Sequence, residues 1–329
     1  MEVTAVAGND QIAMVYIADF GQGRAVEFVE SIQLPLPREK KWVLMVSTLF
    51  GCPVKCLMCD AGGTYQGKLS CDEILAQIDY LVKKRFPGEF IPVEKFKIQF
   101  ARMGEPSFNP SVLDVLTELP NRYHAAGLIP SLSTIAPRGV DHFFERLLEI
   151  KECLYPNGQF QFQFSLHTTD ENLRDQLIPV KKWSFAQMAA YGNRFYKTGD
   201  RKITLNFALA KGMPISPQVL GTFFDPKKYL IKITPLNPTC QAVKNGLSSY
   251  LDPYEKKGDH EIGHLLAEWG YEVIVAIGEV EENQIGSNCG QYLLKYLDER
   301  TPVANGYTYH LQSVLPIKKE IYPYARSTD

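Results

Sequence analysis

The sequence has no run of 18 or more apolar residues, and nothing at its N-terminus resembles a signal peptide. We therefore expect no membrane-spanning helix and no targeting segment, which makes the cytoplasm the default location. Basic residues are not in excess either, since the net charge is −2 and the isoelectric point is near 6.3. That balance argues against the broad basic surface used in non-specific nucleic-acid binding, although it allows a local basic patch.

Cysteine is sparse, with seven residues in the chain. An odd number without a signal peptide argues against a disulfide framework. Three of the seven nevertheless lie close together, because Cys52, Cys56 and Cys59 form the pattern C-x3-C-x2-C. They follow an apolar, strand-like run from Trp42 to Val46.

This cysteine loop predicts an iron–sulfur cluster. Thiolates are the usual ligands of such clusters, and Gly51 and Pro53 allow a short loop to fold around one. Three ligands for four irons leave one iron open to a small molecule. The alternatives are buried structural thiols or a partial zinc site, but neither Cys71 nor His124 has the spacing of a fourth zinc ligand.

The length of 329 residues and the hydrophobic content of 45% are sufficient for one large α/β domain. Strand-like runs alternate with helical patterns at intervals of roughly 25 to 40 residues, as in parallel βαβ units. Six or seven units are too few for a closed barrel of eight, so we predict a partial, open (β/α)6-type barrel. The predicted strands after Trp42 to Val46 are Phe96 to Phe100, Ile129 to Thr134, Gln159 to Leu166, Lys202 to Leu209, Tyr229 to Pro235 and Glu272 to Ile277.

Three segments divide the chain. Two β-prone runs, Ile12 to Ala18 and Ala25 to Leu34, predict a β-hairpin extension over residues 1–37. The core then covers residues 38–295, and residues 296–329 form a tail that fits either a lid or a partner surface. Within the core, Ser70 to Glu73 reads S-x-x-E before an apolar helical stripe and predicts a capping box.

Polar residues follow several of the predicted strands. They are the Arg102 to Pro106 segment, Ser133, Ser165 with His167, and Asn237. Each alone is a common turn or cap residue. Because the carboxyl ends of parallel strands meet at one mouth, we expect these residues to gather beside the cysteine loop.

The order of these motifs resembles the radical SAM superfamily, with C-x3-C-x2-C after the first strand and G-E-P after the second. Five further motifs, in order within residues 12–295, are similar to the RlmN/Cfr family, whose members are radical SAM enzymes that methylate adenine in ribosomal and transfer RNA. These motifs are M-G-E-P-S-F-N (Met103 to Asn109), L-S-T (Leu132 to Thr134), S-L-H followed by R-D-x-L-x-P (Ser165 to Pro179), L-N-P (Leu236 to Pro238) and N-C-G-Q (Asn288 to Gln291).

The resemblance implies two cofactors, a [4Fe–4S] cluster and S-adenosylmethionine (SAM). Cys52, Cys56 and Cys59 would hold the cluster, whose open iron takes the amino and carboxylate groups of SAM. One electron, from a flavodoxin- or ferredoxin-type donor, would cleave SAM to a 5′-deoxyadenosyl radical. Gly104 and Glu105 would meet the methionine amino group, and the other implied SAM contacts are Ser133, Ser165, His167 and Asn237.

Cys289 is the second chemical centre that the resemblance implies. The matching family cysteine accepts a methyl group from one SAM, loses a hydrogen atom from that methyl to the radical made from a second SAM, and attacks an sp2 carbon of the substrate. A structural cysteine in a turn is the alternative. Glu30 resembles a family carboxylate near the substrate.

Two departures from the family pattern bear on function. The family cysteine that releases the covalent adduct corresponds here to Met45, and a thioether cannot form a disulfide. Cys240 is the first candidate to substitute, followed by Cys71 or Cys153; otherwise the adduct breaks down differently, or the product is not a simple methyl group. Family members that act on RNA carry a helical domain ahead of the core, whereas this sequence begins almost at the predicted hairpin, so we expect an RNA base and a small molecule both to stay open as substrates.

Other functions are also compatible with parts of the sequence. His260, Glu261 and His264 form H-E-x-x-H, which on a helix can bind zinc for hydrolysis. Gly263 weakens that helix, and no third zinc ligand follows in a clear motif. A radical SAM enzyme with a non-methylating reaction and a sensor without turnover are further alternatives.

Overall fold

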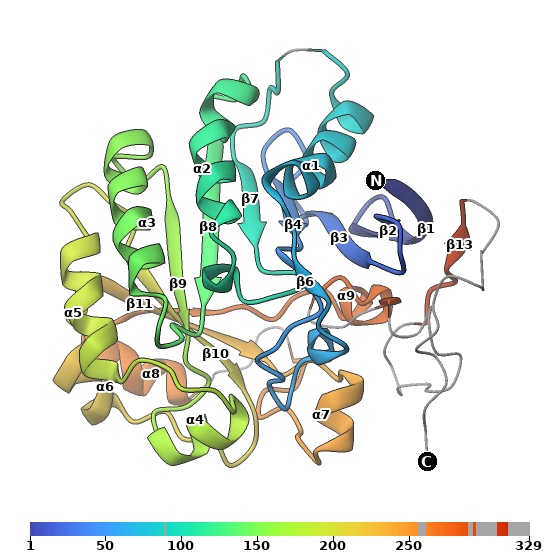
Figure 1. Ribbon diagram of the computed structural model, residues 1–329. Helices are drawn as coiled ribbons and strands as arrows, with labels where there is room; N and C mark the ends of the chain where they lie inside the picture. Colours follow the sequence, from blue (N-terminus) through green and yellow to red (C-terminus); the bar gives the residue numbers. More distant parts are fainter. Residues whose placement is uncertain (89, 256–260, 289–291, 294–307, 315–329) are drawn as a thin grey trace.

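A single mixed sheet of 11 strands forms the centre of the molecule, in the order β12-β11-β10-β9-β8-β7-β4-β3-β2-β1-β13 (Figure 1). This computed structural model describes residues 1–88, 90–255, 261–288, 292–293 and 308–314. The strands are β1 (Glu2–Asn9), β2 (Ala13–Asp19), β3 (Ala25–Ile32), β4 (Trp42–Val46), β7 (Phe96–Phe100), β8 (Leu128–Thr134), β9 (Gln161–Ser165), β10 (Ile203–Leu209), β11 (Tyr229–Pro235), β12 (Glu272–Val275) and β13 (Gln312–Ser313).

The part of the sheet from β4 to β12 is parallel, and each strand pairs with the next core strand along the chain. Such an order requires a crossover between every two strands, and helices supply most of the crossovers. The sheet ends at β12 on one side and at β13 on the other, so it is open. The predicted α/β class and partial barrel are therefore confirmed.

Helices α1, α2, α3 and α5 lie along one face of this sheet (Figure 1). The capping box predicted for α1 is present, since the Ser70 hydroxyl accepts a hydrogen bond from the Glu73 backbone N–H and the Glu73 carboxylate accepts one from the Ser70 N–H. Among the described residues, no helix is long and apolar enough to cross a membrane. The helices are α1 (Cys71–Arg85), α2 (Ser111–Arg122), α3 (Asp141–Leu154), α4 (Glu171–Leu177), α5 (Phe185–Phe195), α6 (Pro217–Phe223), α7 (Cys240–Lys244), α8 (Glu261–Glu268) and α9 (Val280–Ile285).

The N-terminal segment differs from the predicted hairpin. The hairpin β2–β3 is present, but β1 precedes it and pairs with β2 antiparallel, and β3 pairs with β4 of the core. The residues of β1 are mostly small, which gave the sequence little strand signal there. Because β3 joins β4 directly, the extension continues the core sheet.

The strand pleat divides the side chains between a helix-covered face and an interior face. In β7, Phe96, Ile98 and Phe100 are fully buried, while Lys97 and Gln99 between them are half-buried. Successive strand residues point to opposite faces, so these two polar side chains point away from the helices. Strand register extends this interior face to Met45 of β4, which pairs with Gln99.

Candidate active site

The cysteine loop begins at the carboxyl end of the sheet, shortly after β4. The short strands β5 (Leu49–Phe50) and β6 (Gly67–Lys68) pair antiparallel, which brings the two ends of the loop together. Gly51 has a φ of +74°, and a Cβ atom there would lie 2.4 Å from the Thr64 carbonyl oxygen. The tight start of the loop therefore requires glycine.

Cys52 is buried, Cys56 and Cys59 are half-buried, and no disulfide joins any of the three. Burial raises the pKa of Cys56 to about 12, and the neighbouring Cys52 and Glu105 add to the shift. In the described part of the chain, no group of three His, Cys, Asp or Glu side chains is arranged around a single metal ion. Thiolates are the usual ligands of an iron–sulfur cluster, so a cluster stays the prediction for this loop.

Helix α7 holds the cysteine loop from one side. The buried Asp60 carboxylate accepts hydrogen bonds from the backbone N–H groups of Cys240 (3.0 Å) and Gln241 (2.8 Å), the first two residues of this helix. Thr239 caps α7 and also donates its hydroxyl hydrogen to the Met58 carbonyl at 2.8 Å. The sequence analysis missed Asp60, although an acidic residue directly after Cys59 is a signal for such a contact.

The M-G-E-P segment follows β7 and packs against the start of the loop. Gly104 has a φ of +103°, and a Cβ atom there would lie 2.5 Å from the Leu49 side chain. The Glu105 carboxylate is buried and accepts hydrogen bonds from Ser107, from the Thr134 hydroxyl (2.5 Å) and from the Ile135 N–H (3.0 Å). Glu105 thus connects the ends of β7 and β8, and its contact with a methionine amino group stays a prediction.

Ser133 and His167 each have a polar side-chain atom that is available to hydrogen-bond a ligand at the site. The Ser133 hydroxyl is buried and has no hydrogen-bond partner in the described structure. His167 has a φ of +67°, and its Nδ1 accepts a hydrogen bond from the Ala208 N–H at 3.1 Å. Burial lowers the pKa of His167 to about 3. The ring is therefore neutral and carries its proton on Nε2, which makes it a donor.

Ser165 and Asn237 lie at the same end of neighbouring parts of the sheet, where both are half-buried. Ser165 ends β9 and pairs with Asn206 of β10. Asn237 lies between β11 and α7, two residues before Thr239. The predicted SAM contacts therefore all lie at the carboxyl ends of strands β7, β8, β9 and β11, as expected from the motif order.

Arg102 and Glu27 form a buried ion pair that sequence reasoning missed. Their closest atoms are 2.5 Å apart, and the side chains are 1% and 0% exposed. The guanidinium also donates hydrogen bonds to the carbonyls of Gly286 (2.8 Å), Ser287 (3.1 Å) and Asn288 (3.0 Å). The spacing of the two glutamates of β3, Glu27 and Glu30, is the signal that could have identified Glu27, because residues three apart in a strand point to opposite faces.

The same ion pair holds the chain on both sides of residue 289. The Leu293 N–H donates to the Glu27 carboxylate at 3.1 Å, four residues beyond the predicted methyl carrier. Cys289 itself lies outside the described residues. Burial raises the pKa of Glu27, and the Arg102 guanidinium opposes that shift.

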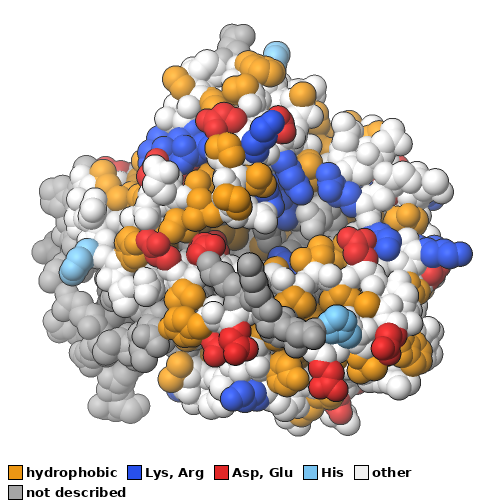
Figure 2. Space-filling model, turned by 180° about the vertical axis from the view of Figure 1, so that it is seen from behind, with side chains coloured by type: hydrophobic (Ala, Val, Ile, Leu, Met, Phe, Trp, Pro, Cys, Tyr) orange, Lys and Arg blue, Asp and Glu red, His pale blue; other side chains and the backbone are white. Residues whose placement is uncertain are grey.

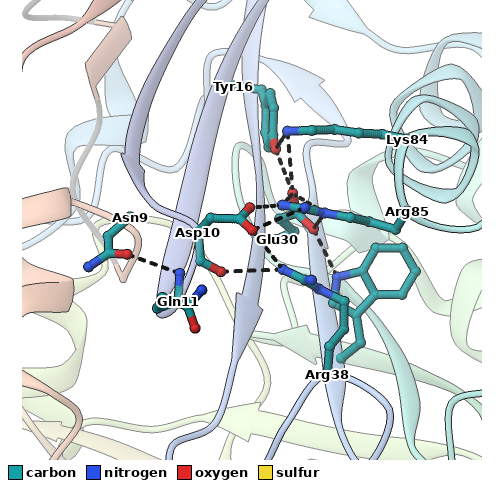
Figure 3. A network of polar contacts seen from close by, with 9 residues as sticks. Asn9, Asp10, Gln11, Tyr16, Glu30, Arg38, Lys84 and Arg85 are labelled. Atoms are coloured by element: carbon teal, nitrogen blue, oxygen red, sulfur yellow. Dashed lines mark hydrogen bonds and ion pairs between the residues drawn. The ribbon is translucent and has the colours of Figure 1, made fainter.

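Glu30 lies on the helix-covered face of β3, and its predicted place near the substrate stays a prediction. Its carboxylate is 2% exposed and accepts hydrogen bonds from the Tyr16 hydroxyl, the Trp42 indole and the Arg85 guanidinium (Figure 3). These partners come from β2, β4 and α1. Since Glu27 and Glu30 are three residues apart in β3, they point to opposite faces, and Glu27 takes the site-facing position.

The residues considered for release of the covalent Cys289 adduct lie in different parts of the fold. Met45 faces the interior of the sheet. Cys240 begins α7, beside the cysteine loop. Cys71 begins α1 and lies 3.5 Å from Glu118 of α2, while Cys153 is exposed on α3, so both belong to the helical layer.

The H-E-x-x-H motif is only partly described, because His260 lies outside the described residues. His264 lies on α8 and is exposed. The cysteine loop lies instead beside α7. Nothing in the described part of the structure favours a zinc hydrolase.

The sequence of this chain is similar to those of several known proteins. No protein-family model matches the sequence. A probable dual-specificity RNA methyltransferase RlmN from Desulfitobacterium hafniense is 28% identical over 222 residues, which is 64% of this chain but only 59% of that relative's length. The ribosomal RNA large subunit methyltransferase N from Nitrosopumilus maritimus is 25% identical over 300 residues, 88% of this chain and 79% of the relative.

Among solved structures, a radical SAM methyltransferase from Sphaerobacter thermophilus has a similar fold. The TM-score is 0.66 at 19% sequence identity, and the match covers 88% of this chain and 80% of the other. It supports the same open α/β architecture for both proteins.

Proposed function

Because the chain is an RlmN/Cfr-like radical SAM enzyme, we propose that it transfers a SAM-derived one-carbon group through Cys289. The acceptor is an unactivated sp2 carbon of an adenine in RNA or of a small molecule. The cysteine loop, the polar strand ends and the segment around residue 289 together favour methylation as the reaction.

The residues at the mouth fit the two cofactors that such an enzyme uses, a [4Fe–4S] cluster and SAM. Cys52, Cys56 and Cys59 lie on one loop with no disulfide between them. The orphaned Ser133 hydroxyl and the neutral His167 ring both need polar partners, which a ribose and an adenine have. When bound, the cluster and SAM supply a 5′-deoxyadenosyl radical that removes a hydrogen atom from a methyl group.

Cys289 takes part in two bond-forming steps. Its thiolate would accept a methyl group that SAM supplies, with S-adenosylhomocysteine as the leaving product. After loss of one hydrogen atom, the carbon on the Cys289 sulfur would join the sp2 carbon of the acceptor, and the adduct would then give up its unpaired electron to the cluster and a proton to a base. The protein then has to release this adduct with a group other than residue 45, and Cys240 is our first candidate.

The contact that supports this proposal most is that of Arg102 with the segment before Cys289. Arg102 directly precedes the M-G-E-P motif, and its guanidinium binds three successive carbonyls at residues 286–288. One side chain thereby connects the motif expected at SAM with the segment expected to carry the methyl group. Arg102 is a positioning residue, because it acts through the backbone of that segment.

The test measures the methyl group on Cys289. We expect peptide mass spectrometry of the anaerobically purified protein to find one added methyl group on Cys289. Arg102→Lys keeps the charge beside Glu27 but loses the forked donors, so Cys289 methylation should fall at least tenfold while 5′-deoxyadenosine is still formed. Arg122→Lys, on the exposed side of α2, is the matched control and should leave methylation unchanged.

Three outcomes would each contradict a part of the proposal. An unmodified Cys289 in the wild-type protein, with SAM and reductant present and 5′-deoxyadenosine formed, would mean radical chemistry without this methyl carrier. Equal methylation in Arg102→Lys and wild type would remove the positioning role of Arg102. Free turnover without Cys240 would count against that thiol as the releasing group.

A further inference from the structure

The interior face of the sheet is lined by polar side chains. Gln99 of β7 faces this interior, and the register of β9, β10 and β11 puts Gln163 beside Thr204 and Asn206 beside Lys232 on the same face. The opposite face carries the apolar core under the helices. Figure 2 shows the molecule from the side away from those helices, where the surface is hollowed and Lys and Arg side chains lie beside the hollow.

Lys97 is the central cation of this interior. It points away from the buried Phe96 and Ile98 of β7. The ammonium group of its side chain has no ion pair and no hydrogen bond in the described part of the chain. The charged groups that act on it most strongly are all cations, namely Lys232, Lys41, Lys95 and Arg201.

Several positive charges gathered in a hollow repel one another and lose hydration. Together with burial, this repulsion lowers the pKa of Lys97 to about 7 and that of Lys41 to about 8. The charges that act most strongly on Lys97 and Lys41 include no carboxylate that would offset this repulsion. A bound anion would relieve the repulsion.

Thr204 is a separate indication of a ligand on the same face. The residue is 1% exposed, and its hydroxyl is buried without a hydrogen-bond partner in the described structure. It lies in β10 with its side chain on the interior face, next to Gln163 of β9. Buried hydroxyls almost always have a partner, so an unpaired one that faces a polar hollow indicates a missing polar group.

We propose that this interior surface binds the phosphate group of a small, mononucleotide-sized acceptor, with Lys97 as the main anion contact and Thr204 as a hydrogen-bonding contact. The inference rests on the proposed function, since it names the acceptor of that reaction. Lys97 lies three residues before the end of β7, about 10 Å along a strand, and the M-G-E-P segment begins beyond that end. A nucleotide can bridge such a distance with its phosphate at Lys97 and its base toward the mouth.

The location favours a small acceptor over an RNA chain. A polymer needs cations along an outer surface to neutralise successive phosphates. Here Lys97 and Lys232 lie on the interior face of the sheet, Lys41 and Lys95 directly precede two of its strands, and the net charge of the whole chain is −2. Amide side chains such as Gln99 and Asn206 could read the hydrogen-bonding edge of one base.

The test compares the binding of adenosine 5′-monophosphate (AMP) and adenosine to the cluster-loaded protein by isothermal titration calorimetry, with SAM present and at fixed ionic strength. We expect AMP to bind at least tenfold more tightly than adenosine. Lys97→Met should remove that difference, and Thr204→Val should weaken AMP binding by a smaller factor. Lys83→Met, which changes an exposed lysine of α1, is the matched control and should bind like wild type.

Proton uptake gives an independent readout. At pH 8, Lys97 with a pKa of about 7 is mostly neutral, and a bound phosphate should raise that pKa. AMP binding should therefore take up protons, seen as a binding enthalpy that depends on the ionisation enthalpy of the buffer. This dependence should be smaller in Lys97→Met than in Lys83→Met.

Several results would overturn the inference. Adenosine binding as tightly as AMP, or AMP binding equally to wild type and Lys97→Met, would exclude a phosphate site at Lys97. Lys97-dependent binding of a short RNA oligonucleotide without AMP binding would replace the small acceptor by RNA. Because binding needs no turnover, an unmethylated Cys289 together with Lys97-dependent AMP binding would overturn only the methyl-transfer proposal.

Discussion

His167 shows how one residue acquires a fixed protonation state. Its backbone lies in the left-handed region, which turns the ring back so that Nδ1 meets the Ala208 N–H. Burial and the nearby Arg174 lower its pKa, so the ring stays neutral in the folded protein. A fixed tautomer gives the site one defined hydrogen-bond donor at Nε2.

This pKa predicts a pH dependence of stability. The ring has a pKa of about 3 in the folded protein and about 6.5 in the unfolded chain. As the pH falls from about 6.5 toward 3, only the unfolded state takes up the proton, so the free energy of unfolding decreases across this window. Urea unfolding at pH 7.5, 6.5 and 5.5 should show a smaller decrease for His167→Gln than for wild type.

The exposed His142 of α3 is the control for this measurement, and His142→Gln should keep the wild-type pH dependence. Equal pH dependence in His167→Gln and wild type would mean that His167 titrates normally in the folded protein.

At the level of elements, the short helix α7 and the cysteine loop stabilise one another. Asp60 accepts two backbone N–H groups at the start of α7, where the helix dipole favours a negative charge. In return, the side chains of Thr239 and Asn245 bind carbonyls of Met58 and Leu57 within the loop. The loop therefore keeps its shape through contacts about 180 residues apart in the sequence.

Asp60→Ala should weaken this arrangement. A buried donor left without its acceptor typically costs about 1–3 kcal/mol, and the backbone N–H groups of Cys240 and Gln241 would lose theirs. We expect less iron per chain after reconstitution and faster loss of iron to a chelator, followed by the absorbance of the cluster.

Asp141→Ala serves as the control, because Asp141 is exposed in the first turn of α3, away from the cysteine loop. Wild-type iron retention in Asp60→Ala would show that α7 does not contribute to cluster stability.

For the molecule as a whole, the open sheet explains how distant motifs reach one mouth. Parallel strands that follow one another in space as in sequence bring the ends of β7, β8, β9 and β11 to one side. The N-terminal strands extend this sheet, and Glu27 of β3 thereby reaches Arg102 after β7. In the described part of the chain this sheet ends at β12 and β13 and does not close into a barrel.

The metal content of the purified protein distinguishes a radical SAM enzyme from a zinc hydrolase. The wild-type protein should contain about four irons per chain and no stoichiometric zinc. Changing Cys52, Cys56 and Cys59 together to alanine should remove both the iron and SAM cleavage, measured by metal analysis and 5′-deoxyadenosine formation. His264→Ala should leave both unchanged, since His264 is exposed on α8.

Stoichiometric zinc in the wild type, together with a large loss of activity in His264→Ala, would support the hydrolase instead. Iron retained near the wild-type level in the triple alanine variant would overturn the ligand assignment.

The sequence by itself determined the elements and the motif order. Strand alternation and apolar runs gave β4, β7 and β11 at their observed bounds, because each has one face against the helices. The capping box of α1 was equally readable, since its partners are three residues apart. The cysteine spacing is local too, and it placed Cys52, Cys56 and Cys59 on one loop, where their role as cluster ligands stays a prediction.

Tertiary structure decided the contacts between residues far apart in the chain. Strand parity puts Glu30 on the helix-covered face beside the cations of α1, whereas Glu27 lies on the interior face beside Arg102. The Arg102 contacts with residues 286–288 and the convergence of cations on Lys97 depend on how the sheet curves. Local patterns predict which face a side chain takes, whereas its partner across the interior is set by the packing of the complete sheet.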